Sequence, residues 1–394
     1  MRNTLVILNN NSKIYTPNIK AKLSYVYDNV SLFFIDENLN YSKHEIIQKI
    51  NSIINEKNIF SIYFQGDYLS LINHHFINKI NCEKKFLMVT DDFDTHEVNS
   101  INSLAVNSVI ATDLIDVYNY KTKSLNAEFW FLEGSKKIFY NTHEEKIYDV
   151  IFFGALKADR KEYLDFLISK KINVKIIEPS KYGFLQVEEI VTYINKSKIV
   201  LNFSKAGKKN KFYSHKTYPF EYYNIKGRIM MSALCDTFCL SEDSPSLKII
   251  YENNQIPTFK NKEEMYEKIN FLLNNEKDFE KIKLNFINKL KKYEDSVYFP
   301  ILHKKIVEQN NRKKVDNLPL WYLRIYFIKS YKMYGKTINF MPFIKTISNN
   351  INECFAYNKQ AAFFLIPEGI LYFIYISCKI LLNKIKKIEK NKKH

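Results

Sequence analysis

The chain has 394 residues, of which 46% are hydrophobic and only 8 are Gly, and its formal net charge is +17. That length and apolar content suffice for two cores, whereas so few glycines exclude long Gly-rich phosphate loops. The five Cys are scattered and odd in number, which excludes a disulfide framework and indicates a reducing compartment. Cys235 and Cys239 lack a second Cys/His pair at zinc-site spacing, so we expect no structural zinc.

The positive charge is concentrated at the carboxyl end. Residues 312–394 hold sixteen Lys or Arg and four Asp or Glu, so they carry +12 of the +17. A nucleic-acid groove through residues 1–311 would need a basic stripe there, so we expect no nucleic-acid partner. The amino terminus, MRNTLVILNNN, has too short an apolar run for a signal peptide, and we expect a cytoplasmic protein.

Residues 1–140 alternate apolar runs with helical patterns. The runs LVIL, SLFFI, FSIYF, KFLMV and SVIAT predict buried strands, and residues 42–56 predict a helix capped by Ser42. Strands that alternate with helices indicate parallel βαβ units. We therefore predict an N-terminal Rossmann-like domain over residues 1–140, which ends after AEFWFL and a Glu-Gly-Ser turn.

A polar segment, residues 141–148, predicts a linker, and the pattern then restarts. DVIFFG, NVKIIEP and KIVLNF predict strands, while ADRKEYLDFLISK and QVEEIVTYINKS predict helices between them. Further helical patterns run from 263 to 309. A restart of βαβ units is typical of two doubly wound domains in tandem, so residues 149–311 predict a second Rossmann-like domain.

Residues 312–394 predict a basic, aromatic and largely helical extension. Its apolar stretch 361–382 has the length of a bilayer span, but Pro-Glu-Gly at 367–369 interrupts it. We expect residues 369–378 to lie on an anionic membrane surface. A spanning helix, and a helix packed on the body with a solvated Lys tail, are the alternatives.

The stretch 196–273 predicts a nucleotide pocket. An apolar strand leads through a polar loop to a helical pattern, then to a second strand and an acidic loop. α/β domains build nucleotide pockets in this order, at the carboxyl ends of their strands. Ser214, Thr217 and Pro219 mark a helix start, so we expect Glu221 in the early turns of that helix, as acceptor for a ribose diol.

Cations just upstream complete the set of groups that a nucleotide diphosphate needs. Lys205, His215 and Lys216 lie in the loop that we expect to face the same opening. Cations and helix N-terminal N–H groups hold a pyrophosphate. The structural alternatives are that Glu221 is only a helix-dipole partner and that His215 is a solvated loop residue.

With these motifs the second domain resembles the C-terminal domain of GT-B glycosyltransferases, in particular the CgeB-like group of glycosyltransferase family 1. The resemblance rests on K-x4-E in KTYPFE, the Lys226-Gly227 turn, the loop LSEDS and a capping box from Asn261 to Glu264. DVIFFGALKADRKEYLDFL and SKIVLNF fit it as well. The two-domain plan extends it to about residues 1–310, although the amino half matches in architecture alone.

The resemblance implies roles for individual residues. Glu221 would bind the ribose hydroxyls, Lys216 would lie near the diphosphate, and the Ser-Glu-Asp loop at 241–243 would approach the donor sugar. Together with the cations above, the candidate donor-binding residues are Gly154, Arg160, Lys205, His215, Lys216, Glu221, Ser241 and Glu242. The chain departs from the family pattern at Ile229, where a second Glu is usual.

A rival motif follows the strand KFLMV. Asp91-Asp92-x-Asp94 has the D-x-D pattern with which GT-A glycosyltransferases bind Mn²⁺ and the donor diphosphate, and such cations prefer oxygen ligands. A helix start at 94–97 would also attract Asp. In a GT-B protein the same residues would lie on the N-terminal face of the cleft, where we expect Asp92, Asp94 or His96 to act as general base on the acceptor hydroxyl.

The sequence therefore predicts an α/β protein with two tandem Rossmann-like domains and a helical, basic extension. We expect it to transfer a sugar from a nucleotide-sugar donor, UDP-linked, to a cell-surface glycan or lipid-linked acceptor in polysaccharide biosynthesis. Residues 312–394 would hold it peripherally at the cytoplasmic face of the membrane. We expect no metal or other cofactor, because cations and a helix start would stabilise the departing diphosphate. The alternatives are a metal-dependent GT-A enzyme using Asp92 and Asp94, and a non-catalytic binding protein with a GT-B body.

Overall fold

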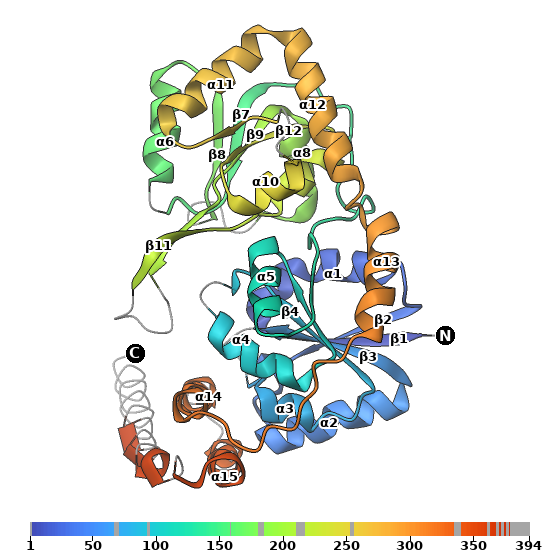
Figure 1. Ribbon diagram of the computed structural model, residues 1–394, viewed down its shortest axis with the longest axis vertical. Helices are drawn as coiled ribbons and strands as arrows, with labels where there is room; N and C mark the ends of the chain where they lie inside the picture. Colours follow the sequence, from blue (N-terminus) through green and yellow to red (C-terminus); the bar gives the residue numbers. More distant parts are fainter. Residues whose placement is uncertain are drawn as a thin grey trace, which may run out of the picture.

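Two parallel sheets, each flanked by helices, form two domains that lie one above the other in the computed structural model (Figure 1). The structure describes residues 2–66, 71–92, 95–157, 159–179, 185–209, 217–252, 256–334, 340–360, 363–367, 370–371, 374–375 and 378. This architecture confirms the predicted pair of doubly wound domains.

The N-terminal sheet has the strand order β2-β1-β3-β4-β5-β6, and all of its pairs are parallel. Its strands are β1 (Asn3–Leu8), β2 (Asn29–Phe34), β3 (Ile59–Gly66), β4 (Lys84–Val89), β5 (Ser108–Ala111) and β6 (Ala127–Phe129). Its helices are η1 (Asn10–Tyr15), α1 (Thr16–Leu23), α2 (Lys43–Glu56), α3 (His74–Asn78), α4 (His96–Asn102) and α5 (Leu114–Thr122). Ser42 caps α2 as predicted, in a capping box with Glu45.

The C-terminal sheet has the order β13-β12-β9-β7-β8 and is also parallel. Its strands are β7 (Tyr148–Phe153), β8 (Val174–Ile177), β9 (Ser197–Asn202), β12 (Phe238–Glu242) and β13 (Thr258–Phe259). Its helices are α6 (Arg160–Ser169), α8 (Val187–Asn195), α9 (Arg228–Leu234), α10 (Pro245–Tyr251), α11 (Lys262–Asn274) and α12 (Glu276–Lys291). In both sheets the first strand lies between the second and the third, so each sheet has a switch point where ligands bind in doubly wound folds.

Residues 217–223 form a strand, so the predicted helix around Glu221 is wrong. β11 (Thr217–Tyr223) pairs antiparallel with β10 (Lys205–Lys209), and this hairpin extends out from the C-terminal domain (Figure 1). The segment TYPFEYY is rich in β-branched and aromatic residues, and these favour a strand over a helix. Pro219 is tolerated because a two-stranded hairpin consists of edge strands.

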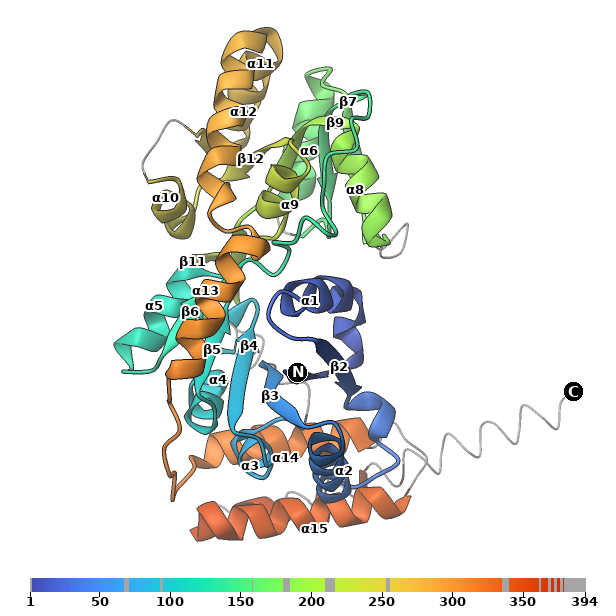
Figure 2. The ribbon, with the colours of Figure 1, turned by 90° about the vertical axis from the view of Figure 1, so that its right-hand side faces the viewer.

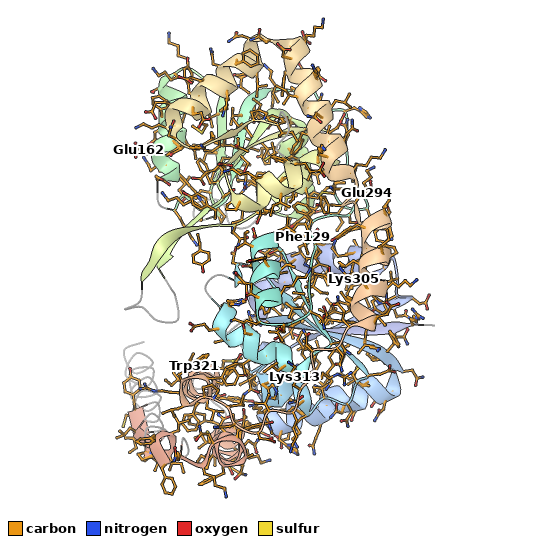
Figure 3. All side chains as sticks on the ribbon, in the orientation of Figure 1. Phe129, Glu162, Glu294, Lys305, Lys313 and Trp321 are labelled. Atoms are coloured by element: carbon orange, nitrogen blue, oxygen red, sulfur yellow. The ribbon has the colours of Figure 1, made fainter. Side chains whose placement is uncertain are left out.

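The chain returns to the N-terminal domain earlier than predicted. α13 (Asp295–Glu308) packs on that domain: the Tyr298 hydroxyl donates to the Phe129 carbonyl at 2.7 Å, and Phe299, Leu302 and Ile306 join its core. Figure 3 labels residues along the returning chain, namely Glu294, Lys305, Lys313 and Trp321. Residues 295–311 therefore belong to the N-terminal domain, and the predicted boundary at 311 is wrong because the apolar face of α13 is buried there.

The first part of the extension packs on the N-terminal domain. α14 (Leu320–Tyr334) and α15 (Phe340–Tyr357) lie beside α2 and α3 (Figure 2). The Lys43 Nζ–Glu353 Oε2 ion pair, 2.5 Å long and nearly fully buried, joins α15 to α2. These two helices therefore pack on the body, whereas the alternatives for residues 361–382 concern the segment that follows them and stay open. No helix among the described residues is both long and apolar enough to cross a membrane, and the Lys run after Cys378 lies outside those residues.

Candidate functional site

The loops after the carboxyl ends of β4 and β5 contact the segment that precedes α9, so the two domains meet there. Asn224 Nδ2 donates to Asp91 Oδ1 at 3.2 Å, and Lys226 forms an ion pair with the same carboxylate. The backbone N–H of Ile225 donates to Asp113 Oδ2 at 2.7 Å. Asp91 and Asp113 follow neighbouring parallel strands, whose carboxyl ends lie at the same edge of the sheet. Both carboxylates therefore contact the same segment of the C-terminal domain, residues 224–226.

Gly154 and Arg228 lie at the switch point of the C-terminal sheet, between β7 and β9. Arg228 Nε donates to the Phe153 carbonyl at 2.7 Å, and Nη1 donates to Asn202 Oδ1 at 3.3 Å, so the guanidinium joins the ends of both strands. Gly154 has φ +140°, and a Cβ there would overlap the guanidinium. Gly154 is thus required both by its backbone conformation and by the close approach of Arg228.

The charge on Arg228 persists in this partly buried position. Burial and, to a smaller extent, the neighbouring Arg160 lower its pKa to about 10, whereas Cys239 and Glu133 act in the opposite direction. With that pKa the guanidinium remains protonated at neutral pH. It therefore supplies positive charge where a doubly wound domain binds the phosphates of its ligand.

Three of the predicted donor-binding residues come together next to this point, namely Arg160, Lys205 and Glu242, and their role in binding a donor stays a prediction. Arg160 donates to the carbonyls of Ala155 and Lys205, at 3.1 and 3.3 Å, and the Lys205 N–H donates to Glu242 Oε2 at 2.7 Å. Burial raises the pKa of Glu242, although the Lys205 N–H opposes that shift. Burial lowers the pKa of Arg160, and Glu242 opposes it.

Ser241 supports the strand ends from inside the domain. It is fully buried, and its hydroxyl accepts a hydrogen bond from Asn202 Nδ2 at 2.8 Å. Ser204, close by, donates to the Glu242 carbonyl at 3.0 Å. Ser241 therefore holds β9 and β12 together, and its placement does not match the sugar-facing position that the resemblance implies.

Several predicted residues cannot be placed in the site. His215, Lys216 and Asp94 lie outside the described residues, and of Glu221 only the backbone, in β11, is described. The roles expected for these four residues therefore stay predictions.

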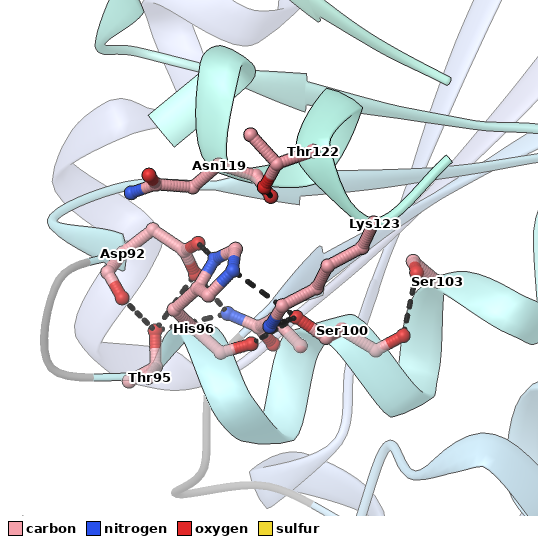
Figure 4. A network of polar contacts seen from close by, with 9 residues as sticks. Asp92, Thr95, His96, Ser100, Ser103, Asn119, Thr122 and Lys123 are labelled. Carbon is pink, nitrogen blue, oxygen red and sulfur yellow. Dashed lines mark hydrogen bonds and ion pairs between the residues drawn. The ribbon is translucent and has the colours of Figure 1, made fainter. Parts of the chain in front are cut away.

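His96 and Asp92 form a polar network at the start of α4 (Figure 4). Asp92 Oδ2 accepts a hydrogen bond from His96 Nδ1 at 2.8 Å, while Oδ1 accepts from Asn99 Nδ2 at 2.7 Å and from Thr95 Oγ1 at 3.1 Å. Asp92 is fully buried, whereas 16% of the His96 side chain is exposed. Asp92 thus orients the ring, and a neutral His96 keeps its Nε2 lone pair available to accept a proton. The Ser100 hydroxyl lies 3.3 Å from that nitrogen.

The sequence alone did not point to Arg228, Asp113 or Glu133, and it named Asp91 only within the D-x-D motif, not as a contact of the C-terminal domain. Asp113 is the N-cap of α5 and accepts hydrogen bonds from Ile115 N, Ile225 N and Ser246 Oγ. Burial raises the pKa of its carboxyl. A carboxylate directly after a predicted strand, as in SVIATD, is a signal that could have identified Asp113. No local pattern distinguishes Arg228 or Glu133, because each gains its importance from a partner distant in the sequence.

Among the residues that the structure describes, no group of three His, Cys, Asp or Glu side chains is arranged to hold a metal ion. Asp92, one of the two carboxylates of the D-x-D alternative, already binds His96, Asn99 and Thr95. Asp91 and Asp92, the described carboxylates that follow β4, therefore both contact hydrogen-bond donors of the protein itself.

Part of the chain matches a known protein family. Residues 131–294 match the family model described as glycosyl transferase-like. No curated protein matches the chain.

Solved structures match over most of the chain. HepE of Anabaena, solved with UDP and glucose, is 10% identical with a TM-score of 0.55, over 77% of this chain and 99% of that one. T4 phage BGT, solved with its substrate UDP-glucose, is 12% identical with a TM-score of 0.50, over 78% of this chain and 100% of that one. At such identities the likeness shows the fold, which is GT-B. A GT-A fold lacks the second parallel sheet that this chain has. The alternative of a GT-A enzyme is therefore wrong.

Proposed function

Because the chain carries a glycosyl transferase-like domain on a GT-B fold, we propose that this glycosyltransferase takes its sugar from a UDP-linked donor bound in the C-terminal domain. The observation that carries the proposal is the charged cluster at the switch point between β7 and β9, where Arg228 and Arg160 surround the loop after Gly154. Two guanidinium groups at this position suit a diphosphate. The solved neighbours with the same fold hold UDP or UDP-glucose.

Titration of the full chain with UDP, GDP and CMP tests the donor. We expect UDP to bind with a Kd between about 1 μM and 1 mM, the range usual for enzyme substrates. Arg160→Ala should weaken UDP binding about 10- to 150-fold, because a charge-assisted hydrogen bond is worth about 1.5–3 kcal/mol. Lys161→Ala is the matched control, since Lys161 is the next residue and pairs with Asp165 on the surface. Absence of nucleotide binding would instead support the non-catalytic alternative.

We further propose that His96 is the general base, oriented by Asp92, and that the acceptor is a hydroxyl of a surface glycan or lipid-linked sugar. His96 begins α4, which follows the carboxyl end of β4, and Asp91 in the intervening segment contacts Lys226 of the C-terminal domain. An acceptor bound there would lie between this ring and the donor site. The basic end of the chain supports an acceptor found at a membrane surface.

The last described residues of the extension support peripheral membrane binding. Phe363 and Phe364 are 75% and 69% exposed, and Leu371 and Tyr375 further along are also exposed. In the sequence, this apolar stretch leads into a run of lysines, and the combination suits an anionic bilayer. We propose that residues 359–394 dock the enzyme on the cytoplasmic leaflet.

Binding to vesicles tests this docking. Replacing both Phe363 and Phe364 by Ser should lower partitioning of the full chain onto anionic vesicles at least about tenfold, since a buried Phe contributes about 1.5–3 kcal/mol. Neutral vesicles should bind the unmodified chain weakly. Ile301→Ser is the control, because Ile301 is 67% exposed on α13, outside the extension. Equal partitioning of all three proteins would reject the docking role.

A further inference from the structure

Glu133 lies where the chain crosses from the N-terminal to the C-terminal domain, against the backbone at the start of α9. Its carboxylate is so close to Gly227 that a Cβ on that glycine would overlap it. The next residue along is Arg228, whose guanidinium lies at the switch point. Only 9% of Glu133 is exposed, so its charge acts in a medium where screening by water is weak.

Two further charges face Glu133, one from α1 and one from the second crossing between the domains. Lys22 of α1 and Asp295 of α13 form an ion pair, with 1% and 0% of their side chains exposed. The Asp295 N–H donates to the Gly134 carbonyl at 2.9 Å, and a Cβ on Gly134 would overlap the Asp295 carboxylate. The two segments that cross between the domains therefore meet the start of α9 in one buried charge cluster. The cluster contains two cations, Lys22 and Arg228, and two carboxyl groups, Glu133 and Asp295.

We propose that Glu133 is a positioning residue that sets how much of the positive charge on Arg228 is available to the donor diphosphate. An ionised Glu133 offsets the guanidinium, and a protonated Glu133 leaves its charge uncompensated. A diphosphate at the switch point adds negative charge nearby, so its binding favours the protonated form. This inference rests on the proposed donor site and deepens it.

The groups around Glu133 make this equilibrium accessible near neutral pH. Burial raises the pKa of Glu133 to about 7. Asp295 acts in the same direction, whereas Lys22 and Arg228 oppose the rise. Burial also raises the pKa of Asp295 to about 6 and that of Tyr15, which faces the same cluster, to about 12. Because the folded-state pKa of Glu133 exceeds its ordinary value, its ionisation costs folding stability as the pH rises through about 7. Donor binding should correspondingly take up a proton from solvent.

The affinity for UDP-glucose between pH 6.5 and 8.5 tests the inference, because neither phosphate of this ligand titrates in that range. The affinity of the unmodified chain should fall about five- to tenfold as the pH rises, since one pKa unit corresponds to a tenfold change. Glu133→Gln should remove most of this dependence and bind UDP-glucose at pH 8.5 at least as tightly as the unmodified chain. Glu128→Gln is the matched control: Glu128 is a buried carboxyl that pairs with Lys305 of α13 and is not part of the cluster around Glu133, so its variant should keep the full dependence.

A second measurement needs no variant. Titration calorimetry of the unmodified chain at pH 7.5 in buffers with different ionisation enthalpies should show net proton uptake when UDP-glucose binds. If Glu133→Gln keeps the original pH dependence, or if binding takes up no proton, the inference is overturned while the donor site stands. If the unmodified chain binds no UDP-glucose at any pH, the proposed donor and the inference both fall.

Discussion

Replacement of His96 by Ala should lower kcat/KM for sugar transfer about 10²- to 10⁴-fold, the usual contribution of a general base. The Kd for UDP should stay unchanged, because the ring belongs to the N-terminal domain and the donor cluster to the C-terminal domain. The structural reason is the 2.8 Å hydrogen bond between His96 Nδ1 and Asp92 Oδ2, which leaves Nε2 as the proton acceptor. Steady-state kinetics and nucleotide titration on the same preparations separate the two effects.

Two further variants test whether His96 acts through its orientation. Asp92→Asn keeps the size of the side chain but can donate to Nδ1, which favours the wrong tautomer, so we expect a loss in kcat with UDP binding intact. His44→Ala is the control, because His44 is exposed on α2. Turnover that survives both His96→Ala and Asp92→Asn would eliminate this pair as the base and leave Asp94, still a prediction, to be examined.

Replacement of Glu353 by Ala should lower the free energy of unfolding by about 3–5 kcal/mol, the cost of leaving a buried charge without its partner. The Lys43–Glu353 pair is 4% and 5% exposed, and Asn73 Nδ2 also donates to Glu353 Oε1 at 2.6 Å. Burial alone would raise the pKa of Glu353, but Lys43, His75 and Asn73 together hold it below its ordinary value. Glu353 is therefore ionised at neutral pH, and its loss leaves the Lys43 ammonium buried and unpaired. Urea denaturation monitors the change.

Two controls separate the buried charge from a general effect on α15. Lys345, which is also on α15, forms an exposed ion pair with Glu45 of α2. Lys345→Ala removes this pair and should lower the free energy of unfolding by less than about 1 kcal/mol. The double variant Lys43→Met, Glu353→Leu should recover most of the loss, since two apolar residues of similar volume replace the pair. A loss for Glu353→Ala no larger than that for Lys345→Ala would show that α15 contributes little to the stability of the domain. A large loss would also mean that removing residues 312–394 disturbs the N-terminal domain, so point variants suit the membrane experiment better than deletion of the extension.

The strands and the division into two parallel domains could be predicted from the sequence. Runs such as LVIL, KFLMV and DVIFFG are continuously apolar because both faces of a parallel strand are covered by helices, and this pattern is local. Ser42 likewise caps a helix through a neighbour three residues away. Of the candidate site residues, Gly154, Arg160, Lys205 and Glu242 meet in one cluster because each lies at or after the carboxyl end of a strand, and these ends share one edge of the sheet.

What the sequence by itself determined was therefore the set of elements whose physical cause lies within a few residues: buried strands, helix caps and the order of βαβ units. Only the tertiary structure decided where charges and apolar faces find partners distant in the chain. It placed Glu221 in a hairpin strand, returned α13 and α15 to the N-terminal domain, and brought Glu133 of the domain crossing against the start of α9, beside Arg228. Burial and long-range electrostatics depend on which segments meet in space, and no local pattern of residue types contains that information.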